Sequence, residues 1–390
     1  MIAIALLLPF LQAPRPAAQD AGTSRTLEFS CILAVSLDRH VVDRWNHTAG
    51  SEGVSASTTE RVVRKQYFTI YPFFGGLTAD DKGRERARID VKITKPDGQT
   101  YYEAADMDGH DEPAGGTGGV LLSKELVTAC FEPEDALGRY EIEVTVRDLA
   151  SGASSTKKHA LQLVEYVDDP AFEDDAELEA WFGGYFRAPN PTRAIPALLA
   201  YCANGWESER PSDARGFLRE VFEDNHWLFT ELFARFASLD EGTRRAALWL
   251  LSRSTCDSKA FVKVLGDADR AAWAAIGASF HDPVEEPITG RVDVNELWSM
   301  YLASRRYALI QRLCATLEQD ATGVVEKSTI PDADRGVDVP LGSIVAIVVS
   351  DLLRKTSRSD AVTRNYLEWI RAHVSTPKAV RAELELILKE

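Results

Sequence analysis

The sequence lacks the patterns that mark most metal centres and catalytic nucleophiles. Its seven histidines include no HExxH and no HxH pair, which argues against a zinc site. It has no G-x-S-x-G, the motif that places a serine nucleophile at a strand-to-helix turn. Its five cysteines include no CxxC pair. No recognised motif therefore indicates metal-dependent or nucleophilic catalysis.

Basic residues and long apolar runs are also scarce. The 390 residues contain 44 Lys and Arg against 60 Asp and Glu, a net charge of −16. An acidic chain repels phosphate backbones, which excludes general nucleic-acid binding. Residues 341–353 form the longest internal apolar stretch, but it is too short for a bilayer and contains Asp351. We therefore expect a core helix there and no membrane span in the mature chain.

The cysteines leave two interpretations open. Five is an odd number, so at most two disulfide bridges can form and one thiol stays free. The thiols can equally act as small buried hydrophobic groups. If one bridge forms, Cys31–Cys130 is the first candidate, because both cysteines lie in strand-like segments of the same half.

The N-terminus has the features of an export signal. Residues 1–13 are almost wholly apolar, and small residues follow, so that cleavage after Ala13 or Ala18 fits the small-residue rule. No Lys or Arg precedes the run, which leaves a buried N-terminal helix as the alternative. Cys31 lies too far from the run to carry a lipid anchor. The sequence thus predicts a signal peptide over residues 1–22 and a periplasmic or secreted protein.

Residues 23–167 have the pattern of a β domain. In residues 87–94, Ile89, Val91 and Ile93 alternate with polar residues, and residues 140–147 alternate in the same way. The tripeptide 96–98 (Pro-Asp-Gly) is a strong turn signal. About seven strands follow one another without a helical pattern between them. This arrangement predicts an all-β sandwich or barrel rather than a doubly wound sheet.

One segment of this half resembles the E–F corner of immunoglobulin-like (Ig-like) sandwiches. Residues 135–140 (Asp-Ala-Leu-Gly-Arg-Tyr) place Tyr140 after a glycine at the start of a strand. In Ig-like domains such a tyrosine donates a hydrogen bond back to the chain. Ile142 stands where antibody domains have a cysteine, so the segment is similar to bacterial Ig-like or fibronectin-like modules. The resemblance implies adhesion, spacing or partner contact rather than catalysis.

Residues 168–390 have helical periodicity and predict an all-α domain. Eleven segments fit helices: 177–186, 194–203, 214–222, 227–237, 243–251, 268–280, 294–303, 308–318, 344–354, 361–373 and 377–388. Tryptophans recur at intervals of 21 to 25 residues, at 181, 206, 227, 249, 273 and 298. Such intervals favour a HEAT-like helical repeat, although large aromatics also scatter through any helical core. Residues 323–340 are polar and broken, and they predict a long loop.

An acidic cluster is the strongest candidate for a metal site. Asp106, Asp108, Asp111 and Glu112 lie close together beside a glycine, and crowded carboxylates suit Ca²⁺. The cluster lacks the spacing of an EF-hand loop. A solvated acidic turn is the alternative. Apart from this calcium hypothesis the sequence predicts no cofactor.

An aromatic run is the candidate binding edge of the β half. Residues 67–74 contain five aromatic rings, and alternation would bury only one face of the strand. Tyr71, Phe73 and Phe74 would then offer an exposed aromatic edge, of the kind that grips glycans or peptides. Simple core packing is the alternative.

Two functions compete. The two halves together resemble exported bacterial proteins with an N-terminal Ig-like sandwich and a helical tail, to which no activity is assigned. That resemblance implies a non-enzymatic binding or scaffold protein of the cell envelope, with a protein or envelope component as its partner. The second hypothesis is a glycan-acting enzyme of the envelope with its active site in the helical half. Glu177, Glu179 and Glu223 are its candidate carboxylates, since such enzymes use two carboxylates that leave no motif.

Overall fold

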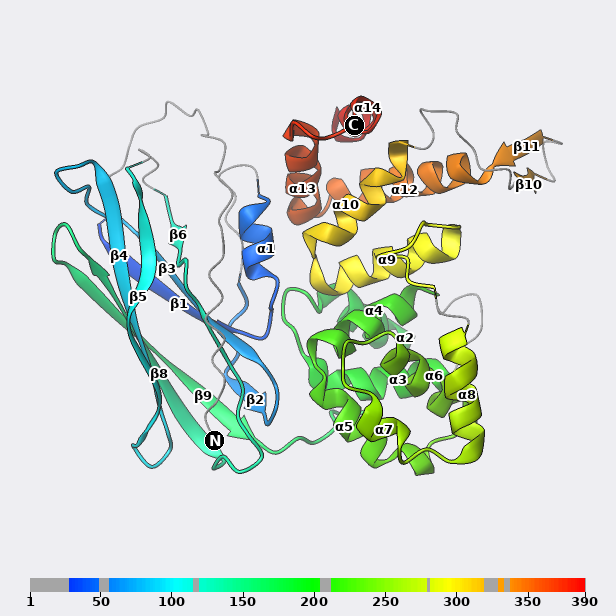
Figure 1. Ribbon diagram of the computed structural model, residues 1–390, viewed down its shortest axis with the longest axis horizontal. Coiled ribbons are helices and arrows are strands. Elements are labelled where there is room, and N and C mark those ends of the chain that lie inside the picture. The colour runs from blue at the N-terminus through cyan, green and yellow to red at the C-terminus, as the bar shows by residue number, and fades with distance from the viewer. Residues whose placement is uncertain are drawn as a thin grey trace. The chain divides into compact units, whose positions relative to one another are not determined.

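The computed structural model describes residues 28–48, 56–114, 119–203, 212–278, 281–318, 329–332 and 337–389. The chain divides into two compact units, and the main division falls between Val167 and Asp168, where the sequence pattern changes. The described part of the first unit is built mainly of strands, and that of the second mainly of helices (Figure 1). The predicted signal peptide lies outside the described residues.

Two sheets make up the β unit. Its described strands are β1 (Ser30–Ser36), β2 (Arg61–Val63), β3 (Phe68–Gly75), β4 (Arg84–Thr94), β5 (Thr100–Pro113), β6 (Leu121–Leu122), β7 (Val127–Ala129), β8 (Gly138–Asp148) and β9 (Ser154–Val164). In the first sheet β3 pairs with β1 on one side and with β6 and β7 on the other. The second has the order β2–β9–β8–β4–β5. All these pairs are antiparallel except β2 with β9.

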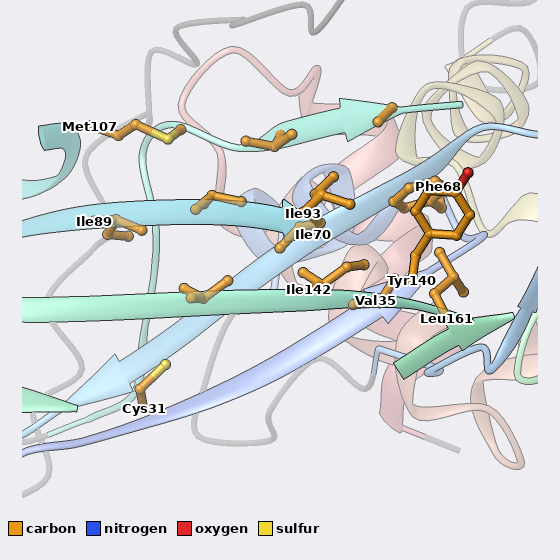
Figure 2. Packing of buried hydrophobic residues seen from close by; sticks show 14 of the residues in the cluster. Cys31, Val35, Phe68, Ile70, Ile89, Ile93, Met107, Tyr140, Ile142 and Leu161 are labelled. Atoms are coloured by element: carbon orange, nitrogen blue, oxygen red, sulfur yellow. The ribbon is translucent and has the colours of Figure 1, made fainter. Parts of the chain in front are cut away.

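The two sheets share one hydrophobic core, and the predicted alternation is confirmed. Ile89, Val91 and Ile93 of β4 are at most 2% exposed, whereas Lys92 between them is exposed. Tyr140, Ile142, Val144 and Val146 of β8 are fully buried in the same way. Side chains of β1 and β3 complete the cluster from the first sheet, as Figure 2 shows. The period of two residues therefore fixes which face of each strand turns inward.

Backbone hydrogen bonds from loop segments cover the outer strands of both sheets. The N–H groups of Lys124 and Glu125 donate to the carbonyls of Gly109 and Asp108 on β5. At the other side, Thr59 N–H donates to Val35 O of β1 at 2.7 Å. Unpaired strand edges invite pairing with other chains. These contacts reduce the open edge of both sheets.

The Pro-Asp-Gly turn between β4 and β5 is confirmed. Gly98 N–H donates to Lys95 O at 3.0 Å, and Asp97 Oδ1 accepts from Gln99 N–H at 2.9 Å. Gly98 has φ +85°, a conformation that only glycine adopts without strain. β5, however, extends to Pro113 and is much longer than the sequence indicates.

The Tyr140 hydrogen bond implied by the Ig-like resemblance is confirmed. Its Oη donates to Ala136 O at 2.9 Å, and the ring packs against Phe131 and Tyr101 in the core. We expect Tyr140→Phe to lower the free energy of unfolding of the β unit by about 1 kcal/mol, because the ring stays and one hydrogen bond is lost. Denaturant unfolding measures this. A loss below about 0.3 kcal/mol would show that the bond does not stabilise the corner.

The helical unit contains every helix that the sequence predicts, and most of them have shifted ends. Its described helices are α2 (Asp175–Gly184), α3 (Ala194–Ala203), α4 (Ser212–Asp224), α5 (Trp227–Ala234), α6 (Glu241–Ser252), α7 (Lys259–Val262), α8 (Asp267–Ala278), α9 (Arg291–Ser304), α10 (Tyr307–Ala315), α12 (Leu341–Ser357), α13 (Ala361–Ala372) and α14 (Lys378–Lys389). No described helix is both long and apolar enough to span a membrane. The short helices α1 (Val41–Asn46) and α7 were not predicted, and the described residues 42–48 belong to the helical unit.

Helices α4 and α9 pack closely although they are far apart in sequence. Gly216 of α4 allows this, because a Cβ built there would lie 2.2 Å from Glu296 O and 2.3 Å from Ser299 Oγ of α9. In a helical repeat protein each repeat packs on the repeats next to it in sequence, whereas α4 packs on the distant α9. The tryptophans are not equivalent either, since Trp181 is buried and Trp273 is half-buried.

The prediction of a long loop at residues 323–340 is wrong for its described part. β10 (Thr329–Asp332) and β11 (Val337–Pro340) pair as an antiparallel hairpin that leads into α12. Proline and acidic residues hide this strand character in the sequence, because they are poor strand formers. The remaining residues of that stretch lie outside the described ones.

Candidate functional site

The four predicted calcium ligands lie on strand β5 and not in an acidic turn. Asp111 Oδ1 accepts hydrogen bonds from Arg84 Nε and Nη2 at 2.9 and 2.7 Å. This bidentate contact lowers the pKa of the Asp111 carboxyl. Asp108 lies 3.7 Å from Arg88. Arginines at alternate positions of β4 lie opposite these acids on the neighbouring strand. Oppositely charged side chains that face each other in this way stabilise the pairing of two strands.

The other two acids also have cationic partners. Glu112 lies 3.2 Å from Lys124 Nζ. Asp106 has φ +61° at a register shift between β4 and β5, and its side chain lies 3.4 Å from Arg147. Among the described residues, no group of three or more His, Cys, Asp or Glu is placed to hold a metal ion. The interpretation as an acidic turn is wrong, and the structure does not bring the four carboxylates together.

The predicted aromatic edge on β3 is also wrong. Tyr71, Phe73 and Phe74 are only 1%, 7% and 1% exposed. Every residue of β3 is buried, because this strand lies inside its sheet and both of its faces are covered. Tyr71 Oη donates to Asp38 O at 2.9 Å, so the segment after β1 covers the face that alternation would leave open.

All five cysteines are free thiols, and the Cys31–Cys130 bridge does not form. Cys31 lies in the core between the sheets, and burial raises its pKa to about 11. Burial also raises the pKa of Cys314 to about 12. Thiols with such pKa values stay protonated at neutral pH and react slowly. The alternative of small buried hydrophobic groups describes Cys31 and Cys314.

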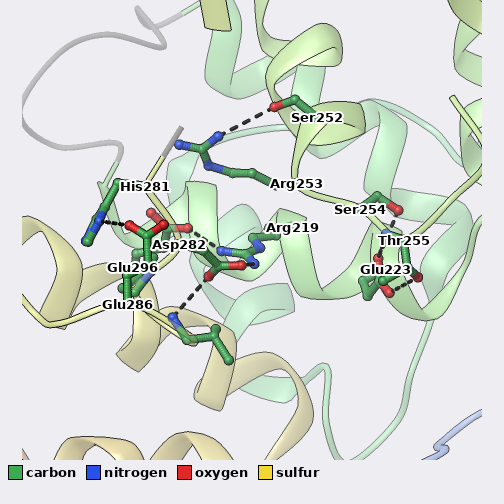
Figure 3. A network of polar contacts seen from close by, with 12 residues as sticks. Arg219, Glu223, Ser252, Arg253, Ser254, Thr255, His281, Asp282, Glu286 and Glu296 are labelled. Atoms are coloured by element: carbon green, nitrogen blue, oxygen red, sulfur yellow. Dashed lines mark hydrogen bonds and ion pairs between the residues drawn. The ribbon is translucent and has the colours of Figure 1, made fainter. Parts of the chain in front are cut away.

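The most prominent polar cluster of the helical unit surrounds Arg219 on α4 (Figure 3). Its guanidinium is 8% exposed and donates to Asp282 Oδ2 and Glu296 Oε1, each at 2.8 Å. Asp282 follows α8 and Glu296 lies on α9. Burial raises the pKa of Asp282, but the hydrogen bond and charge of Arg219 outweigh this effect and lower it. The three charged groups thus join three segments in an ion triad.

His281 extends this network at the surface. Its Nδ1 lies 2.6 Å from Glu286 Oε2 and its Nε2 lies 3.2 Å from Asp293 Oδ2. Asp293 Oδ2 also accepts from the N–H and hydroxyl of Thr289, at 2.6 and 2.7 Å. The imidazole therefore connects the segment before α9 to the first turn of that helix.

We expect this histidine to stabilise the protein in acid and less so in base. Burial lowers the pKa of His281, but the hydrogen bonds and charges of Glu286 and Asp293 outweigh it and raise the pKa above its ordinary value. A raised pKa in the folded state stabilises below the unfolded pKa of about 6.5, and this contribution is lost as the pH rises through the folded pKa. Thermal unfolding of the parent and of His281→Gln from pH 5.5 to 9 measures it.

We expect the Tm difference between the parent and His281→Gln to shrink as the pH rises. A difference that does not change with pH would contradict the assignment.

The carboxylates proposed for glycan hydrolysis have structural partners. Glu223 of α4 accepts from Ser254 Oγ and Thr255 N, both at 2.9 Å, and from Thr255 Oγ1 at 2.5 Å. Burial raises its pKa, but these bonds and His226 outweigh it and lower the pKa to about 2. Glu177 lies 2.7 Å from Arg193 Nη2, whereas Glu179 is exposed. Among the described contacts, none joins any two of these three carboxylates.

Sequence reasoning missed the Arg219 triad. The arginine is separated from Asp282 and Glu296 by 63 and 77 residues, so no spacing motif connects them. One signal was present. Arg219 directly follows Phe217 and Leu218 in α4, and a charge within such a buried stretch requires a partner.

Comparisons with known proteins give no family. No protein-family model and no curated protein matches the chain. A family 123 glycoside hydrolase from Clostridium perfringens, studied for glycolipid glycan hydrolysis, matches with 6% identity and a TM-score of 0.22, over 36% of this chain and 28% of that one. The CARDB domain of a Pyrococcus furiosus protein, in complex with di-metal ions, matches with 16% identity and a TM-score of 0.17, over 37% of this chain and 97% of that one. Similarities this low carry no argument about function.

Proposed function

We propose that this protein is an exported, non-enzymatic binding or scaffold protein of the bacterial cell envelope, and that its helical unit holds the partner. Its partner is a protein or another envelope component. The apolar run at residues 1–13 supports export. The Tyr140 corner and the two sheets around one core support an Ig-like β unit that acts as a spacer or contact module.

One observation carries the proposal: α8 and the residue Val264 before it expose a largely apolar surface. Residues 267–278 include six alanines and a tryptophan, and none of the residues of α8 is buried. Val264, just before α8, is 72% exposed. A helix with an apolar surface gains free energy when a partner removes that surface from water.

The state of Glu223 argues against it as the proton donor of the enzymatic alternative. A glycan hydrolase needs one carboxylic acid that is protonated near neutral pH and donates its proton to the leaving oxygen. Glu223 has a pKa of about 2 and therefore remains an anion. Its hydrogen bonds instead attach the segment after α6 to the end of α4.

Site-specific photo-crosslinking in the native envelope tests the proposal. A photoreactive residue replaces Ala274 on α8 in one variant and Lys92 on β4 in a matched variant, both at exposed positions. We expect one abundant partner to be captured through position 274 and not through position 92. Capture through position 92 alone would overturn the assignment to the helical unit.

A second measurement addresses the alternative function. The purified full chain is incubated with envelope glycans, and the products are analysed by mass spectrometry. We expect no turnover by the parent protein. If the parent protein turns over a glycan, and if Glu223→Gln and Glu177→Gln each abolish this turnover, the non-enzymatic proposal is overturned.

A further inference from the structure

The short helix α1 is part of the helical unit although the strands of the β unit flank it in the sequence. The described residues 42–48 group with the helices, while the described residues before and after them group with the strands. Arg44 and Trp45 are 3% and 8% exposed. The chain therefore places a short segment among helices that follow more than 240 residues later.

Adjacent charges on α1 match the two helix ends where α9 turns into α10. Asp43 Oδ2 accepts from the N–H of Tyr307, the first residue of α10, at 2.5 Å. Arg306, the N-cap residue of α10, makes no side-chain capping bond. Arg44 Nη1 donates to Ser304 O, at the end of α9, at 3.4 Å. Helix N-termini favour anions and C-termini favour cations, so both contacts have the favourable sign.

A ring contact adds a second, independent element of recognition. His47 stacks on Tyr307 with a centroid distance of 3.7 Å and an interplanar angle of 4°. Trp369 and Tyr366 of α13 meet the imidazole edge-on, at 5.9 and 6.5 Å. The three rings surround the imidazole of His47, which directly follows α1 and lies four residues after Asp43.

Contacts between α9 and α13 organise the corner that receives α1. Arg305 ends α9 in the left-handed conformation, with φ +52°, and its carbonyl accepts from Tyr366 Oη at 2.8 Å. Its guanidinium lies 3.1 Å from Asp360, at the start of α13. These contacts join the end of α9 to α13, and no residue of α1 takes part in them. The receiving corner therefore has contacts of its own besides those with α1.

We propose that the corner of α9, α10 and α13 is a recognition site for a short helix with adjacent Asp and Arg and a histidine one turn later, a site that this chain fills with its own α1. The partner it fits is a helical peptide whose acid precedes its base, because the N-terminus of α10 and the C-terminus of α9 impose that order. The contact is the helix-in-groove mode of peptide recognition. It is independent of the proposed envelope function.

A charge exchange within the full chain tests the order of the charges. Asp43→Arg combined with Arg44→Asp keeps the composition and reverses the match to both helix ends. We expect the amides at residues 306–312 to exchange with deuterium about fivefold faster or more, which is the effect of losing one helix cap. Amides of β4 and β8 are the internal reference, and Asp267→Ala, at the exposed start of α8, is the control variant. Unchanged exchange at 306–312 would overturn the proposal.

A peptide added in trans tests whether the corner recognises its ligand without the chain connection. The probe is a helix-stapled peptide of residues 38–48. The control is the same peptide with Asp43 and Arg44 exchanged. We expect only the first to slow exchange at 306–312 in the charge-exchanged variant. An equal effect of both peptides, or of neither, would overturn the proposal. If that variant does not fold, Asp43→Ala replaces it with the same expected outcomes, because alanine removes the oxygen that accepts from Tyr307 N–H.

Discussion

Replacing Arg219 with methionine is expected to lower the free energy of unfolding of the helical unit by about 3–5 kcal/mol. The half-buried Asp282 and the buried Glu296 would lose the cation that they share at 2.8 Å. An uncompensated buried carboxylate costs far more than the original pair contributes, since its desolvation is no longer offset. Chemical denaturation followed by far-UV circular dichroism measures the change, because the helices dominate that signal.

The triple variant Arg219→Met, Asp282→Asn, Glu296→Gln is the matched test. It removes all three charges at once, and we expect it to recover most of the stability that Arg219→Met loses, because no buried charge remains unpaired. If the triple variant is as unstable as the single one, packing by Arg219 rather than charge compensation holds the segments together.

Replacing Gly216 with alanine has the second largest expected effect, a loss of about 2–3 kcal/mol. The new Cβ would lie 2.2 Å from Glu296 O, and the obstacle is backbone that cannot rotate away. α4 and α9 would have to separate, and the repacking of two buried helices in a dense interior is costly. Thermal unfolding of the variant measures the loss as a lowered Tm.

Gly277→Ala is the control for this substitution. Gly277 lies on α8 with no other heavy atom within 4 Å of a built Cβ. Alanine there is expected to be neutral or to stabilise by about 0.5–1 kcal/mol, because alanine is the better helix former. A Gly216→Ala variant as stable as this control would contradict the close approach of α4 and α9.

The failed site predictions share one physical cause. Tyr71 and Phe73 lie on a strand whose sequence predicts one open face, but the segment at Asp38 covers that face. Asp108 and Asp111 look like a crowded anionic cluster in sequence, but arginines of the neighbouring strand neutralise them one by one. In each case the partner comes from a segment that local pattern does not connect to the site.

The sequence by itself determined the elements and their inward faces. Strict alternation identified Ile89, Val91 and Ile93 as core, and helical periodicity located α3 to the residue. These features depend on backbone geometry within a few residues, which has a period of 2.0 in strands and 3.6 in helices. The glycine and proline signals of the turn at Gly98 are local in the same sense.

Only the tertiary structure decided which charges and surfaces meet. Arg219 finds its carboxylates 63 and 77 residues away, and α1 lies on helices more than 240 residues further along the chain. Such contacts depend on how whole elements pack, and packing is determined by the sum of many weak, non-directional contacts rather than by any short pattern. Only the folded chain therefore shows the ion triad, the covered aromatic strand and the site that α1 occupies.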